Sequence, residues 1–184
     1  MNRLATKGFI PKIVDSGTNY GKLRILQDTI FIRRKRQQMD ELISLLDENL
    51  RYISHEIENG SILIQAESVR TEAVCPFCGT ASAKVHSRYS RKLQDLPIQG
   101  KKVRIHLENK KYFCINADCN HTTFAEQFDF YDFKATKTKR LQEEILRVAL
   151  TQSSVSASKY LRNSVAEVSK SVICDLLKKE REKS

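Results

Sequence analysis

Two short stretches, VCPFCGT at residues 74–80 and FCINADCNHTTFAE at residues 113–126, hold four of the five cysteines in this chain of 184 residues. The four are Cys75 and Cys78, followed after 35 intervening residues by Cys114 and Cys119. Two close cysteine pairs on two turns are the arrangement in which a zinc ribbon holds tetrahedral Zn²⁺, with Zn–S distances of about 2.3 Å. The spacing therefore predicts one structural zinc ion bound by these four cysteines.

The alternatives for this site concern the fourth ligand and the metal. His121 lies two residues after Cys119 and is the alternative fourth ligand. Iron also accepts four thiolates, but nothing in the sequence indicates electron transfer. Four thiolates fill the coordination shell, so a catalytic zinc is not expected. Gly79 suits a tight knuckle whose backbone N–H groups point at the sulfurs, and Cys174 is expected to be a lone thiol in the last helix.

The composition is that of a globular, intracellular protein. Hydrophobic residues make up 40% of the chain and charged residues 29%. No apolar run approaches the length of a transmembrane helix, and the N-terminus lacks the apolar segment of a secretory signal. We therefore expect a cytoplasmic protein with no membrane partner. In that compartment thiols stay reduced, and paired cysteines indicate a metal more often than a disulfide.

Positive charge is concentrated in two segments. The net charge is +10, and residues 1–38 carry nine Lys or Arg against two Asp or Glu. Residues 84–111, between the cysteine pairs, again carry nine against two. A basic balance of this kind indicates a polyanionic partner, nucleic acid before membrane. The alternative is that residues 1–38 form a solvated arm and that the basic residues of 84–111 lie on a solvent-exposed face that binds no partner.

Residues 102–107 alternate with a period of two, which predicts a half-buried strand with a basic outer face. Val103, Ile105 and Leu107 are expected to point inward. Pro97 and Gly100 indicate the turn before this strand, and a second turn is expected at Glu108-Asn109. The residues that we expect to contact DNA phosphates here are Arg88, Arg91, Lys92, Lys101, Lys102 and Arg104. His86 and His106 are expected to be surface residues on strands.

The segment from Met39 onward predicts a helix followed by a strand. Apolar residues recur at helical spacing up to an Asn59-Gly60 break, and 61–66 then reads as a strand. The apolar residues of this helical stripe are Leu42, Leu46, Leu50, Ile53 and Ile57.

The last third of the chain predicts three helices. They follow a polar connector at 134–139 and cover approximately 141–149, 153–162 and 167–183. Three helices suit a helix-turn-helix, whose last helix enters the major groove of DNA. Lys170, Ser171 and Lys178 are the expected contacts on that helix. A plain helical hairpin is the alternative, because the turn lacks the usual Gly and Asp175 would repel phosphate.

Several short motifs in the sequence resemble those of one known family. They are the CPFCG knuckle, the segment HSRYSRKLQDLP, the basic strand ending in YFC, and CINADC followed by TFAE. Together they resemble the N-terminal zinc-binding region of the ISL-three group of insertion-sequence transposases, over about residues 39–126. The resemblance implies that Cys75, Cys78, Cys114 and Cys119 are zinc ligands. It also implies that a helix-turn-helix follows and that both modules bind the terminal inverted repeats of the element.

The family carries a downstream catalytic domain with an Asp-Asp-Glu triad, and this sequence ends where that domain would begin. Because insertion-sequence transposases are bacterial DNA-binding proteins, the resemblance also implies a bacterial, cytoplasmic protein that associates with the nucleoid when it is bound to DNA. We expect the chain not to be an enzyme by itself, and no catalytic residue is assigned. The expected partners are double-stranded DNA at insertion-sequence ends and either full-length transposase or a second copy. No small-molecule substrate is expected.

The expected fold class is α+β, with a small antiparallel four-cysteine zinc ribbon followed by a helix-turn-helix-like domain. The expected divisions are a basic arm at 1–38, a helix and strand at 39–70, the zinc ribbon at 71–133 and the helical domain at 134–184. The arm lies outside the family pattern, so Met39 is a candidate native start. Two alternative functions stay open: a host-adopted, zinc-dependent transcriptional regulator, and an inert transposase fragment.

Overall fold

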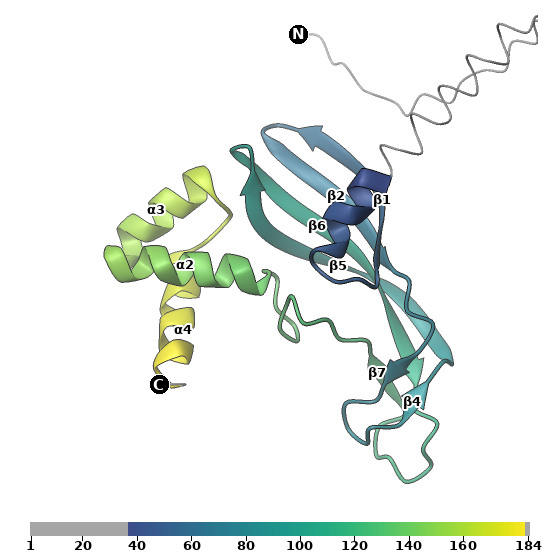
Figure 1. The fold of residues 1–184 in the computed structure, drawn as a ribbon. Helices are drawn as coiled ribbons and strands as arrows, with labels where there is room; N and C mark the ends of the chain where they lie inside the picture. Colours follow the sequence, from purple (N-terminus) through teal and green to yellow (C-terminus); the bar gives the residue numbers. More distant parts are fainter. Residues whose placement is uncertain (1–36, 183–184) are drawn as a thin grey trace, which may run out of the picture. The chain divides into compact units, whose positions relative to one another are not determined.

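The computed structural model describes residues 37–182. Apart from Gln37 and Gln38, these residues belong to the second of two units into which the chain divides, Met39–Ser184. The basic arm expected at 1–38 therefore lies outside the described residues except at its end. This second unit contains a short helical stretch that ends at residue 44, a mixed sheet, a small two-stranded ribbon and three longer helices (Figure 1), as the α+β class expected from the sequence requires.

The main sheet has five strands in the order β1-β2-β6-β5, with β7 paired to the far end of β6. The strands are β1 (Leu50–Glu58), β2 (Ser61–Ser68), β5 (Val85–Ile98), β6 (Lys101–Phe113) and β7 (Thr123–Ala125). A separate two-stranded ribbon joins β3 (Ala73–Val74) to β4 (Ala81–Ser82). Most neighbours are antiparallel, but β2 and β6 run parallel, a pairing that no sequence pattern predicts.

The long β5–β6 hairpin confirms the alternating strand expected at 102–107. Val103, Ile105 and Leu107 are all buried on the inner face of the sheet. Gln99 and Gly100 form the hairpin turn, and both have positive φ angles (50° and 74°). Two consecutive left-handed residues are typical of a type I′ turn, whose twist matches that of the flanking strands.

The turn expected at Glu108-Asn109 is wrong, because β6 continues through both residues without a break. Asn109 is only 1% exposed, and its amide donates to the hydroxyl of Tyr131 at 2.9 Å. Asparagine is common in turns, but here its amide group is buried and hydrogen-bonded to Tyr131, so Asn109 is accommodated within the strand.

The helix expected from Met39 to the Asn59-Gly60 break is wrong beyond its first turns. Residues 37–44 are helical, but β1 then follows. The carboxylate of Asp47 accepts a hydrogen bond from the backbone of Asn49 at 2.8 Å, which turns the chain after the helical residues. The spacing of the β-branched residues in β1 suited a helix and a strand alike, and pairing with β2 favours the strand. Asn59-Gly60 is its hairpin turn, again with two positive φ angles.

The core of the sheet lies on its inner face. The helical residues 37–44 and the loop after β7 cover this face, where Ile43, Phe128 and Tyr131 pack against the buried residues of β2, β5 and β6. The opposite, outer face of the sheet carries polar and charged residues of the same strands. The term "outer face" is used below for this surface.

The three expected helices are confirmed as α2 (Lys139–Thr151), α3 (Ser154–Ser164) and α4 (Lys170–Arg181). Each begins at a hydroxyl side chain that accepts a hydrogen bond from a backbone N–H in the first turn: Thr138, Ser153 and Ser169. Such N-caps stabilise a helix by about 1 kcal/mol each. The helices enclose a second core around Leu141, Ile145, Leu161 and Ile173, which are fully buried.

The segment at 134–139, expected to be a polar connector, is docked on β5. Gln94 and residues 136–138 exchange backbone hydrogen bonds, from Gln94 N to Thr136 O (2.8 Å) and from Thr138 N to Gln94 O (3.0 Å). The buried carboxylate of Asp95 then accepts from the hydroxyl of Thr138 and from Nε of Arg140, both at 2.7 Å. This network fixes the start of α2 to strand β5. No helix among residues 37–182 is long and apolar enough to cross a membrane.

Candidate metal centre and nucleic-acid interface

The four cysteines of the two sequence motifs meet in one cluster. Cys75 and Cys78 lie on the loop between β3 and β4, whereas Cys114 and Cys119 lie on the loop between β6 and β7. The four sulfurs all lie within 4.8 Å of one another, and the Sγ atoms of Cys78 and Cys114 are 3.5 Å apart. Sulfurs of a zinc tetrathiolate with bonds of about 2.3 Å lie about 3.8 Å apart. The cluster therefore fits one tetrahedral zinc ion.

Backbone hydrogen bonds shape both loops into knuckles. In the first, the N–H of Gly79 donates to the carbonyl of Cys75 at 2.9 Å, and Gly79 has a φ of +76°. Glycine adopts this left-handed conformation without the steric cost that a Cβ atom adds. In the second, the N–H of Cys119 donates to the carbonyl of Asn116 at 3.2 Å. Each knuckle thus presents two sulfurs to the same point.

The apolar core around this centre is small. Ala73, Tyr112 and Phe124 are its buried members besides Cys75, and the other three cysteines are only partly buried. The rings of Tyr112 and Phe124 stack with centroids 5.9 Å apart. A core of this size stabilises two loops weakly, so the free energy of metal binding contributes much of the folding free energy of the ribbon.

The pKa values of Cys78 and Cys114 indicate why a cation is needed. Hydrogen bonds from the side chain and backbone of Thr80 lower the pKa of Cys78 to about 6. At Cys114, the backbone of Asn116 favours the thiolate. Desolvation and the neighbouring sulfurs, Cys78 first, outweigh it and raise the pKa to about 12. Four negative charges cannot collect at such short distances without a counter-charge, and Zn²⁺ supplies it. The set of donors thus fits zinc, which would hold all four as thiolates in a closed, structural site.

His121, the alternative ligand, does not join the cluster. Its ring stacks on Phe77, with centroids 3.4 Å apart and planes 2° from parallel. Cys119 occupies the fourth position instead. Cys174 lies on α4, far along the chain from the metal ligands, and its thiol is 3.9 Å from the hydroxyl of Ser154.

The basic residues expected to contact DNA lie on two faces of the β5–β6 hairpin. Strand alternation places Arg88, Lys92, Lys102 and Arg104 on the outer face. Arg91 and Lys101 alternate with these residues and share the side of the buried Leu93 and Val103.

Within residues 37–182, Arg91 and Lys102 have partners. Arg91 lies over the ring of Tyr131, 5.1 Å from its centroid, and donates to the carbonyl of Ala135 at 2.9 Å. The ammonium group of Lys102 lies 2.5 Å from the carboxylate of Glu167.

On the last helix, Lys170, Ser171 and Lys178 are exposed, as is Asp175. Two further basic residues that were not predicted from the sequence, Lys159 and Arg162, lie on α3. With Lys170 they line a shallow groove of about 370 Å³ at the junction of α3 and α4. No sequence motif on α3 distinguishes Lys159 and Arg162 from other charged surface residues.

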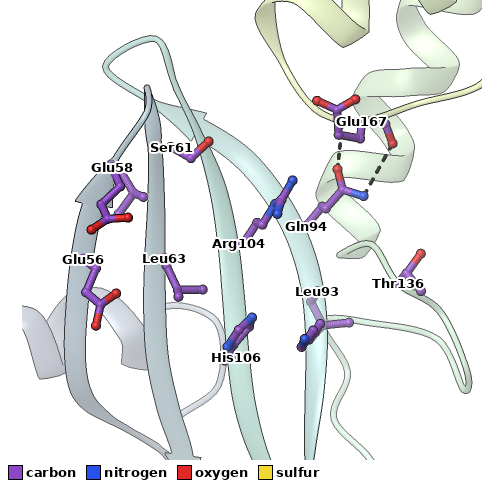
Figure 2. A pocket seen from close by; sticks show the side chains of 12 residues that line it. Glu56, Glu58, Ser61, Leu63, Leu93, Gln94, Arg104, His106, Thr136 and Glu167 are labelled. Carbon is purple, nitrogen blue, oxygen red and sulfur yellow. Dashed lines mark hydrogen bonds between the residues drawn. The ribbon is translucent and has the colours of Figure 1, made fainter.

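The outer face also contains an open groove of about 560 Å³ that sequence reasoning missed. Figure 2 shows Arg104 and His106 on one strand, β6, and Glu56 and Glu58 on the edge strand β1. The acidic and basic residues are far apart in the sequence, and the unexpected parallel pairing of β2 with β6 brings them onto one surface.

One comparison with known proteins identifies the ribbon. Residues 71–119 match the family model described as the zinc-finger of transposase IS204/IS1001/IS1096/IS1165. No curated protein and no solved structure matches the chain. The matched segment contains both cysteine pairs and the whole β5–β6 hairpin, and it shows no catalytic domain. Residues 71–119 are therefore the zinc ribbon of this transposase family, and its four cysteines hold a structural zinc ion.

Proposed function

We propose that this chain is the DNA-binding region of a transposase of this family and that it recognises the terminal inverted repeats of an insertion sequence. The observation that carries the proposal is the match of residues 71–119 to a transposase zinc ribbon. The exposed positive charge on β5, β6, α3 and α4 supports it, because such surfaces attract the phosphate backbone of DNA.

The zinc ion positions the basic hairpin. Strand β6 ends at Phe113 and runs directly into the ligand Cys114, so the metal fixes one end of the strand. At the other part of the hairpin, Asp95 of β5 binds the first residues of α2. The hairpin thus connects the metal centre to the helices, and both DNA-binding elements are held by one continuous pair of strands.

In this proposal α3 and α4 act as a helix-turn-helix. The connection between them, residues 165–169, is longer by one or two residues than the usual turn. Its apolar residues Val165 and Val168 are buried and hold the two helices together. The recognition helix is α4, with Lys170 and Ser171 at its N-terminal end directed at the major groove. Lys159 and Arg162 of α3 then contact the flanking phosphates.

We assign no cutting or joining step to the described residues. Within 37–182, the group of residues suited to a metal ion is the closed four-cysteine cluster. A two-metal strand-transfer reaction needs carboxylate ligands and open coordination positions, which a closed structural zinc does not offer.

The proposal is tested by selecting bound sequences from a random duplex library with the zinc-loaded protein at physiological salt, where non-specific contacts weaken. The expected result is one motif that occurs as inverted repeats at the ends of an insertion sequence. A motif confined to host promoters would overturn the proposal in favour of a transcriptional regulator. Recovery of no motif would favour an inert fragment.

A further inference from the structure

The outer face of the sheet carries a group of basic side chains on two adjacent strands, β5 and β6. Strand pairing sets Lys92 of β5 directly opposite His106 of β6, and Arg104 is the next outer residue along β6. Cross-strand neighbours lie about 5 Å apart and diagonal ones about 7–8 Å, within reach of long side chains. Among residues 37–182, no ion pair is recorded for Lys92 or Arg104, whereas the neighbouring Lys102 has Glu167.

Charges of one sign on adjacent strands destabilise a sheet. Burial lowers the pKa of His106, and the charges of Lys92 and Arg104 lower it further, so the neutral ring predominates at pH 7. The permanent charges are those of Lys92 and Arg104, which lie diagonally across the two strands, and an anion bound between them would offset their repulsion.

Glu167 is an internal anion at the edge of the outer face, beside Lys102 of β6 and Gln94 of β5. Its carboxylate binds Lys102, and its backbone N–H donates to the amide oxygen of Gln94 at 2.7 Å (Figure 2). The hydrogen bond from Lys102 lowers the pKa of Glu167, and the charges of Arg104 and Arg162 lower it further. An internal anion thus occupies one end of the basic surface, and the other end is open.

The far wall of the groove limits where an external anion can lie. Glu56 and Glu58 of β1 occupy the same outer face and repel phosphate. Between the two walls, β2 contributes the uncharged residues Ser61 and Leu63. A polyanion is therefore attracted to the β5–β6 half of the face and excluded from the β1 half.

We propose that the outer surface of β5 and β6 is a phosphate-binding site for duplex DNA, in which Lys92 and Arg104 contact the backbone with His106 beside them. The inference rests on the proposed DNA-binding function and narrows its six strand contacts. Lys92 and Arg104 are direct contacts, Lys102 is held by Glu167, and Arg91 and Lys101 lie on the opposite side of the hairpin. Arg88 shares the outer face but is not among the residues that line the groove. The acidic pair on β1 sets the boundary of the footprint.

The salt dependence of binding tests this assignment. A labelled duplex of arbitrary sequence is titrated with zinc-loaded full chain over a range of salt concentrations, and log Kd is plotted against log salt. Each phosphate contact contributes about 0.9 to the slope for B-DNA. Lys92→Gln and Arg104→Gln should each reduce the slope by about 0.9. The matched control Lys101→Gln removes the same charge from the opposite side and should leave the slope unchanged.

Two further measurements separate a local site from general attraction. Glu56→Gln combined with Glu58→Gln should tighten binding, because the repulsive wall is removed. The pKa of His106, followed by NMR, should rise when the duplex is added. The charged groups that surround His106 in the groove are Lys92, Arg104, Glu56, Glu58 and Glu167.

The site is overturned if wild type binds the duplex but both variants keep its slope, or if Lys101→Gln lowers the slope as much as they do. In either case DNA binding itself would stand. Failure of the wild type to bind any duplex would instead refute the proposed function. Zinc content and far-ultraviolet circular dichroism of each variant confirm that a changed slope does not come from misfolding.

Discussion

Replacing Asp95 tests how firmly the sheet holds the helices. The carboxylate is 2% exposed and accepts from the hydroxyl of Thr138 and the guanidinium of Arg140. A hydrogen bond to a charged group contributes about 1.5–3 kcal/mol, and coupled bonds are not additive. The side chain of Arg140 is 48% exposed, so water rehydrates it when the carboxylate is removed. We therefore expect Asp95→Ala to lower the free energy of unfolding by about 2–3 kcal/mol.

Asp95→Asn should lower it less, by about 1–2 kcal/mol, because the amide oxygen still accepts from Thr138 while the ionic contact with Arg140 is lost. Urea unfolding of zinc-loaded protein, followed by circular dichroism, measures both values. The control is Asp129→Ala, which removes an exposed aspartate with no recorded hydrogen bond among the described residues. A loss for Asp95→Ala no larger than that of the control would refute the proposed role of Asp95.

Three more outcomes follow from the metal centre, the outer face and the core. Cys114→Ser should reduce the zinc content from one ion per chain to none, whereas Cys174→Ser should keep it; atomic absorption decides, and a zinc-free Cys174→Ser would contradict the ligand set. Below the ordinary histidine pKa of 6.5, the unfolded chain binds a proton that folded His106 resists, so stability falls as the pH drops. His106→Gln should therefore gain stability relative to wild type at pH 5 but not at pH 8, and equal pH profiles in urea unfolding would count against this. Leu107→Ala, at a fully buried position, should cost about 2–5 kcal/mol, with exposed Leu150→Ala as the control.

The metal centre and the helices could be predicted from sequence because their signals are local. Cysteine spacing within each knuckle fixes which sulfurs share a turn, and zinc chemistry then requires the two pairs to meet. Apolar residues at helical spacing predict the helices, and hydroxyl residues such as Ser153 and Ser169 mark where they begin.

The sheet was harder to predict because its decisive contacts are distant in sequence. The β-branched residues of β1, Ile53 and Ile57, are four apart and fit either period, and only the pairing with β2 selects the strand. The parallel pairing of β2 with β6, which places Glu56 and Glu58 across from Arg104, has no local signature. The burial of Asn109 likewise depends on Tyr131, 22 residues away.

The sequence predicts only in part which basic residues of the β5–β6 hairpin lie on each face. Arg91 lies two residues before Leu93, so strand alternation alone places it on the buried side once β5 is recognised as a strand. The pairing of Lys102 with Glu167 was not available, since it joins the sheet to the loop before α4.

In the proposed function, one structural zinc organises a DNA-binding region that recognises a defined site. The most direct test measures the affinity of the same protein for its selected duplex when zinc-loaded, when stripped of metal by a chelator, and after zinc is restored. Zinc stoichiometry is followed in parallel. We predict one zinc per chain, loss of site-specific binding on chelation, and recovery of that binding when zinc is restored. Unchanged affinity of the metal-free protein for that site would contradict it.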